Sequence, residues 1–172
     1  MNTVRKNLLL VSIISVLTGS LLTVGLLVAA GWIVLPQGDR QTVVHDMGAQ
    51  VMPFNLGDTT HIFEMTKTGG IQHVVARDPD DAAQIVLIQQ HLNHEAMRFA
   101  AGDFSDPTSL HGNEMPGIQE LADGVEQVSI EYSVLPDGAQ ITFTTQDLSL
   151  ITAIHRWFGA QLSDHGPDAT YR

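Results

Sequence analysis

The side chains of this sequence that could do chemistry are imidazoles, thioethers and carboxylates. The chain of 172 residues has eight His, six Met and 19 Asp or Glu, but no Cys. Disulfides, thiolate zinc sites, iron–sulfur ligation and thiol nucleophiles are therefore excluded together. Imidazole suits copper, zinc and iron, and a thioether shifts the preference toward copper, especially Cu(I). The composition thus favours a site built from His and Met if the chain binds a metal.

Enzymatic chemistry is harder to assign from the residues. The sequence contains neither a phosphate-binding glycine loop nor a G-x-S-x-G elbow. Asp103 and Asp106 stand close to Ser105 and Pro107, and Asp is common in such turns. Because no general base can be assigned, a metal-dependent hydrolase ranks below a binding function. Whether the protein is an enzyme stays open, with a non-enzymatic role favoured.

Charge and hydropathy restrict the partners and the location. The net charge of −11 repels phosphate backbones, which argues against nucleic-acid binding.

Residues 7–35 form an uncharged apolar run preceded by Arg5 and Lys6. This run exceeds both the roughly 20 residues that span a bilayer and the roughly 7–15 of a signal-peptide core. We therefore expect residues 1–35 to be a transmembrane signal anchor.

Two consequences follow from that anchor. The positive-inside rule keeps the N-terminal cations in the cytoplasm, so the rest of the chain lies in the periplasm or outside the cell. The protein is then a single-pass protein of a bacterial inner membrane. The alternative is a cleaved signal peptide, since Val28-Ala29-Ala30 has the small residues that signal peptidase accepts.

Beyond the anchor, the pattern predicts a linker over residues 36–59 and one α+β domain over residues 60–169. The linker is rich in Gly and Pro and has no clear period. The domain shows two similar passes, each with two strand-like segments around a turn followed by an amphipathic helix. We expect a ββα-ββα two-layer fold, with a four-stranded antiparallel sheet and two helices on one face. The expected strands cover residues 60–67, 71–76, 128–134 and 139–144.

Phasing the two helices at 100° per residue separates their histidines. In the first helix, His91 lies on the flank of the apolar face beside Glu95, whereas His94 points away. In the second helix, His155 lies on a flank and His165 falls at the expected end. His91 and His155 would face each other only if the two helices ran side by side in parallel.

The segment 102–117 between the two halves is the most unusual part of the sequence. Three Gly and two Pro restrict its path, and it offers His111 and Met115 from loop backbone. A loop of this kind either binds a ligand or is an idle connection. The sequence leaves both interpretations open.

Several stretches of the chain form a recognisable set of motifs: Gly102–Pro107, His111-Gly112, Met115–Gly117, Ala153–Phe158 and Ala160–Gly166. Over about residues 60–169 they resemble a family of small exported bacterial proteins of unsettled function, often labelled aspartate carbamoyltransferase. That label does not fit, because this chain has neither the length for two α/β domains nor the Ser-Thr-Arg-Thr phosphate loop. The resemblance implies a choice among the histidines, since the motifs contain or adjoin some of them but not His45, His61 or His73.

We therefore predict a copper or zinc site, with copper preferred, formed from His91, His111, Met115, His155 and His165. The competing interpretation is that each imidazole pairs with a carboxylate and that the methionine fills a gap in the core. The predicted function is a membrane-tethered periplasmic metal-binding domain for buffering, delivery or sensing. The alternative is a non-enzymatic accessory subunit of a membrane protein complex.

The predicted topology can be tested with a reporter fused after Arg172. We expect the reporter to be exported and to stay in the membrane fraction, because the apolar run is longer than a signal-peptide core. Recovery of a mature chain starting at Gly31 from the soluble periplasm would contradict the anchor.

Overall fold

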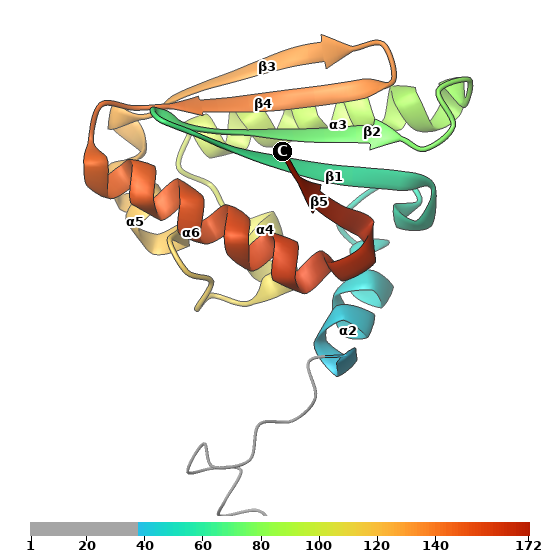
Figure 1. Ribbon diagram of the computed structural model, residues 1–172, viewed down its shortest axis with the longest axis horizontal. Helices are drawn as coiled ribbons and strands as arrows, with labels where there is room; N and C mark the ends of the chain where they lie inside the picture. The colour runs from blue at the N-terminus through green and yellow to red at the C-terminus, as the bar shows by residue number, and fades with distance from the viewer. Residues whose placement is uncertain (1–37) are drawn as a thin grey trace, which may run out of the picture. The chain divides into compact units, whose positions relative to one another are not determined.

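The structure, a computed structural model, describes residues 38–172, which form an α+β domain (Figure 1). This part of the chain contains a five-stranded mixed sheet and five α-helices. Within it, no helix is long and apolar enough to cross a membrane. The expected signal anchor over residues 1–35 lies outside the described residues, so the anchor and the compartment stay predictions.

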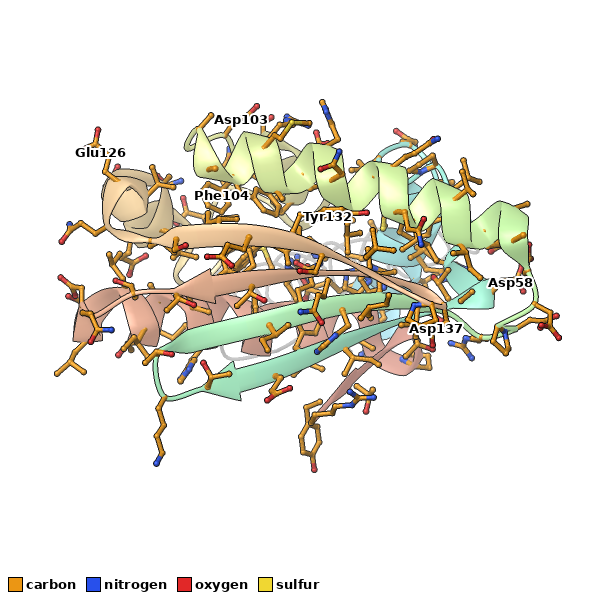
Figure 2. The ribbon with its side chains drawn as sticks, turned by 90° about the horizontal axis from the view of Figure 1, so that it is seen from above. Asp58, Asp103, Phe104, Glu126, Tyr132 and Asp137 are labelled. Carbon is orange, nitrogen blue, oxygen red and sulfur yellow. The ribbon has the colours of Figure 1, made fainter. Side chains whose placement is uncertain are left out.

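Two β-hairpins form most of the sheet, as the alternating pattern predicts. The first pairs β1 (Thr59–Thr66) with β2 (Gly69–Ala76), and the second pairs β3 (Ser129–Leu135) with β4 (Gly138–Thr144). The hairpins join through antiparallel pairing of β2 with β4. The β3–β4 turn, which carries Asp137 (Figure 2), accepts a hydrogen bond from the backbone of Ala76 at the end of β2.

A fifth strand makes the sheet mixed, whereas the sequence predicted a four-stranded antiparallel sheet. The three-residue β5 (Ala169–Tyr171) runs parallel to β1, and the strand order is β3-β4-β2-β1-β5. So short a strand has no alternation to detect. Its position depends on where the preceding helix, over Leu148–His165, ends, because the chain leaves that helix next to the free edge of β1.

The two long helices cover one face of the sheet, with α3 (Ala82–Ala100) beneath β3 and β4 and α6 (Leu148–His165) beneath β2 and β1 (Figure 1). Each begins at an Asp whose side chain accepts hydrogen bonds from the first turn, Asp81 for α3 and Asp147 for α6. They follow β2 and β4, which are antiparallel to each other, so the two helices run in opposite directions.

Three short helices lie in segments that the sequence indicated were irregular. Helix α2 (Gly38–Gly48) lies within the predicted linker, and η1 (Leu56–Asp58) leads from it into β1. Helices α4 (Ser105–His111) and α5 (Ile118–Gly124) occupy the connection between the two halves. The 3₁₀ turns η2 (Val125–Gln127) and η3 (Gly166–Asp168) precede β3 and β5. These helices are too short or too irregular in apolar period to be recognised without their tertiary contacts.

The core between the sheet and the helices is dominated by aromatic rings. Trp157 and Phe158 of α6 are fully buried and contact Phe143 of β4, with ring centres 5.5 and 5.9 Å from it. Phe63 of β1 packs on Phe158 at 5.0 Å. Phe99 of α3 contacts Trp157 edge to face at 5.7 Å. These contacts fix α6 and α3 against the same strands and define the space between them.

The close approach of β2 to β4 gives a test of this packing. Gly69 has φ +141°, and a Cβ there would lie 2.1 Å from the backbone oxygen of Phe143. Gly112 also has a positive φ of +90°, but a Cβ there would meet nothing within 4 Å. We expect Gly69→Ala to lower the free energy of unfolding by more than Gly112→Ala, whose cost is that of the positive φ alone, about 1–3 kcal/mol. Denaturant unfolding of the full chain measures both. Equal losses would show that the overlap is relieved without cost.

Candidate functional site

Four histidines from four different elements line one cavity between α3 and α6, beneath the sheet. They are His61 of β1, His91 of α3, His111 of α4 and His165 of α6. Helix α4 and the segment around Met52 complete the walls. The cavity offers about 50 Å³ to the centres of water-sized molecules, which is room for a few heavy atoms. The site is therefore assembled by tertiary structure and not by a single motif.

His165 contacts two of the other three imidazoles. The rings of His61 and His165 are stacked, with centres 4.7 Å apart and planes 12° from parallel. The ring of His111 meets that of His165 at 5.0 Å and 71°. The ring of His91 meets Phe54 at 5.6 Å. Phe54 also contacts His61 at 6.1 Å, so the rings of His91 and His61 both pack on this phenylalanine.

His111 is oriented by a buried carboxylate. Its Nδ1 lies 3.0 Å from Oδ2 of Asp164, whose side chain is 8% exposed. Arg40 of α2 holds the same carboxylate with two hydrogen bonds, from Nε to Oδ1 at 2.5 Å and from Nη2 to Oδ2 at 2.6 Å. Because the ionised carboxylate only accepts, Nδ1 of His111 carries the proton and Nε2 keeps its lone pair. Histidines that bind a metal through one ring nitrogen commonly donate the N–H of the other nitrogen to a carboxylate in this way.

Burial keeps the imidazoles neutral. It lowers the pKa of His91 and of His165 to about 4, and the pKa of His61 falls well below its ordinary value for the same reason, reinforced by its neighbour His165. Burial also lowers the pKa of His111, in spite of the opposing effect of Asp164. At neutral pH all four rings therefore have an unprotonated nitrogen, which is the form that binds metal ions.

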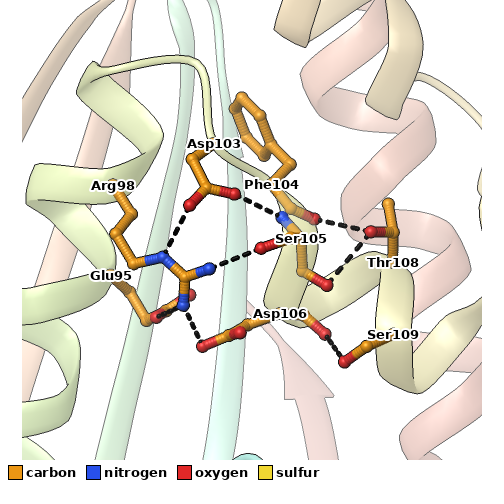
Figure 3. Close-up of polar contacts among 8 residues, drawn as sticks. All are labelled: Glu95, Arg98, Asp103, Phe104, Ser105, Asp106, Thr108 and Ser109. Carbon is orange, nitrogen blue, oxygen red and sulfur yellow. Dashed lines mark hydrogen bonds and ion pairs between the residues drawn. The ribbon is translucent and has the colours of Figure 1, made fainter.

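A pair of carboxyl groups forms the part of the wall between α3 and α4 (Figure 3). Burial, together with a hydrogen bond to Asp106, raises the pKa of Glu95 to about 8. Two carboxyl groups can share a hydrogen bond only if one of them is protonated, and the proton belongs to Glu95 because Asp106 is ionised beside Arg98. Arg98 also pairs at 3.0 Å with Asp103, which precedes α4, while its ion pair with Asp106 fastens α4 to α3.

Three buried polar atoms of the residues that line the cavity have no hydrogen-bond partner in the described part of the chain. They are Nδ1 of His61, Oε1 of Gln72 and Nε1 of Trp157. A buried polar atom without a partner costs about 1–3 kcal/mol, so such atoms are uncommon in native proteins. Three of them on residues of one cavity indicate that it accommodates something polar, whether water, an ion or a small molecule.

The structure brings three of the five predicted ligands together and places two elsewhere. His91, His111 and His165 line the cavity, but Met115 is packed in the hydrophobic core and does not line it. Nε2 of His155 donates to the backbone oxygens of Thr66 and Gly69, at 3.0 and 2.8 Å, and so fixes the β1–β2 turn.

The position of His155 follows from the helix directions. His155 and His165 are ten residues apart on α6, which is about 15 Å along the helix. Since α3 and α6 run in opposite directions, the geometry that would bring His91 and His155 face to face does not arise.

Sequence reasoning missed two cavity residues, His61 and Met52. His61 lies outside the family-like motifs, on which the choice of histidines rests. It nevertheless alternates with Thr59 and Phe63 along β1, and all three are buried. That alternation is a signal that could have identified His61 as inward-facing. Met52 had no such signal, because it lies in an irregular segment.

Comparisons with protein-family models, with curated proteins and with solved structures each find no match to this chain. The resemblance to the exported bacterial family therefore stays a prediction. Within residues 38–172, no three or more His, Asp or Glu are already placed so that they could hold a metal ion together. An ion in the cavity would require some of the rings to rotate.

Stability against pH tests the electrostatics of the cavity. Glu95 holds a proton in the folded state between pH 4.5, its ordinary pKa, and about pH 8. Its contribution to the free energy of unfolding is therefore complete below pH 4.5 and is lost as pH rises toward 8. The histidines act in the opposite direction, because their pKa values are lowered. Their contribution to the free energy of unfolding is complete above pH 6.5 and is lost as pH falls toward 4. We expect stability to decline from pH 6.5 to 8 and Glu95→Gln to flatten this decline. Glu120→Gln, on the surface, is the control. A decline unchanged in Glu95→Gln, measured by denaturant unfolding, would contradict the raised pKa.

Proposed function

We propose that the described domain binds a transition-metal ion in the histidine cavity and that copper is the preferred ion. The observation that carries the proposal is that four neutral imidazoles from separate elements line one cavity of a few atoms' volume. Binding for buffering, delivery or sensing is the role that fits these residues. The membrane tether and the periplasmic location belong to the same proposal.

The pair formed by His111 and His165 supports a shared ion. An ion bonded at about 2 Å to two imidazole nitrogens in tetrahedral geometry sets the ring centres about 5 Å apart. Their ring centres are 5.0 Å apart, with planes 71° from parallel. Asp164 holds Nδ1 of His111, so Nε2 is the nitrogen available to an ion.

His61 and His165 as they stand would not both bond the same ion. A metal lies close to the plane of each imidazole that bonds it through a lone pair. Two stacked rings only 12° from parallel share no such point between them. Nδ1 of His61 makes no hydrogen bond within the described residues, so rotation of this ring would break none there. His61 or His91 would therefore complete the site by side-chain rotation.

A thioether distinguishes copper from zinc in this cavity. Met52 takes the place that the sequence assigned to Met115, since it is buried and lines the cavity. Zinc is bound by imidazole, thiolate and carboxylate, whereas thioether sulfur is a ligand of Cu(I). The ionised carboxylates nearest to the histidines are paired with arginines, and Glu95 is protonated, which leaves a neutral donor set suited to a soft ion.

Metal analysis of the purified full chain tests the proposal. We expect copper to bind, and we expect His111→Ala and His165→Ala each to lose it, because each removes a donor from the central pair. Bound copper should also raise the melting temperature of the wild type, since it binds only the folded state. His91→Gln, a milder change at a half-buried ring, should weaken binding without loss of the fold.

Two histidines outside the cavity are the matched controls. His94 is exposed on α3, and His155 is engaged with the β1–β2 turn. Replacement of either by Ala should leave the bound copper unchanged. Copper retained by folded His111→Ala and His165→Ala, or lost in His155→Ala alone, would place the site elsewhere and reject the cavity.

A further inference from the structure

Helix α2 is attached to the rest of the domain at the end where the histidine cavity lies. Arg40 bonds the Asp164 carboxylate, and Gln41 donates from Nε2 to the backbone oxygen of Ser163 at 2.9 Å. His45 lies 2.8 Å from Asp168 of η3, and Val44 is buried against the domain. The helix therefore docks on the C-terminal end of α6, next to His165.

Arg40 connects this docking to the cavity through two routes. It neutralises Asp164, which in turn accepts the Nδ1 proton of His111. Its Nη2 also donates to the backbone oxygen of His111 at 2.7 Å, at the last residue of α4. The side chain of His111 is 1% exposed, so its ring has little freedom other than that allowed by these contacts.

Removal of the arginine would leave a poor environment for Asp164. The Asp164 carboxylate would lose its two hydrogen bonds from Arg40, and the backbone oxygen of His111 would lose a third. The carboxylate would then be free to move away from Nδ1 of His111, which it alone holds among the described residues. The ring of His111, and with it the lone pair of Nε2, would no longer be fixed at the cavity.

We propose that helix α2 regulates the cavity, because docking of Arg40 on Asp164 fixes His111 with the lone pair of Nε2 available to a bound ion. This inference rests on the metal-binding function proposed above and makes Arg40 and Asp164 positioning residues. α2 begins three residues after the apolar run predicted to be a membrane anchor. A change that pulls on the chain before α2 would thus reach the site through one ion pair.

Coupling between two events is reciprocal. If undocking of α2 weakens ion binding by some factor, a bound ion strengthens the docking of α2 by the same factor. Loss of a carboxylate that orients a ligand histidine costs about 10–100-fold in metal affinity. An effect of that size should be visible both in the affinity of the ion and in the protection of α2.

The experiment compares the wild-type full chain with Arg40→Gln, Arg40→Lys and Arg77→Gln. Arg77 is the matched control, since it is 47% exposed and bonds Asp168, the second carboxylate that contacts α2, whereas Arg40 is 49% exposed and bonds Asp164. Arg77→Gln leaves the contacts among Arg40, Asp164 and His111 in place. Cu⁺ affinity is measured by competition with a chelator of known affinity. We expect Arg40→Gln to weaken it about 10–100-fold, Arg40→Lys to recover part of the loss because it keeps the charge, and Arg77→Gln to match the wild type.

Two further measurements distinguish positioning from a general loss of structure. Imidazole ¹⁵N NMR of the metal-free proteins should show His111 protonated on Nδ1 in the wild type and in Arg77→Gln, and a mixture of the two tautomers in Arg40→Gln, where the carboxylate is no longer held against Nδ1. Amide exchange of residues 38–48 in the wild type should slow on addition of Cu⁺, by a factor similar to the loss of affinity in Arg40→Gln.

The outcomes separate the two proposals. Wild-type protein that takes up no Cu⁺ rejects the metal-binding function and this regulation with it. If the wild type binds Cu⁺, two results reject the regulation alone. One is an equal Cu⁺ affinity in Arg40→Gln and Arg77→Gln, and the other is amide exchange of α2 that does not change when Cu⁺ is added. If Arg40→Gln does not fold, the wild-type exchange measurement decides, because amide exchange of α2 that does not slow on addition of Cu⁺ rejects the regulation by itself.

Discussion

The buried carboxylate of Asp164 is the interaction on which the arrangement of the site depends. An ionised carboxyl with a side chain only 8% exposed is stable only with charged or hydrogen-bonding partners. Its partners are Arg40 and His111, which are 124 and 53 residues away in the sequence. Three helices that share no local sequence signal are thereby brought to one point. The carboxylate fixes the tautomer of one histidine and the position of α2 in the same set of contacts.

The cavity differs in charge from the rest of the protein. The chain carries a net charge of −11, yet burial keeps the four imidazoles of the cavity neutral and Glu95 protonated, and the ionised Asp106 in its wall is paired with Arg98. Protonation of one of two adjacent carboxyl groups avoids placing two like charges together. Burial of the rings thus makes their nitrogens available, and the ion pair with Arg98 offsets the carboxylate charge of Asp106 in this wall.

The sequence predicts what short-range patterns determine. Alternation fixed both hairpins, and Asp81 and Asp147 mark the helix starts because a side-chain cap acts within three residues. The parts it missed have causes far away in the chain. Helix α2 is held by Asp164 and Asp168, and β5 by the edge of β1. Three of the histidines that the sequence analysis grouped, His91, His111 and His165, line one cavity, but only the direction of α6 shows that His155 does not.

A site whose four histidines come from one strand and three helices has a property that a single-motif site lacks. In a motif such as a helix with two ligands one turn apart, the spacing is set by the backbone of one element. Here the distance between His111 and His165 depends on how α4 packs on α6, and that of His61 depends on the sheet beneath which both lie. Any bound ion would therefore gain or lose affinity with the packing of these elements, and Arg40 of α2 contacts two of them, at Asp164 of α6 and at the last residue of α4. The dependence on tertiary structure that hides the site from sequence analysis is therefore also what would let the proposed docking of α2 act on it.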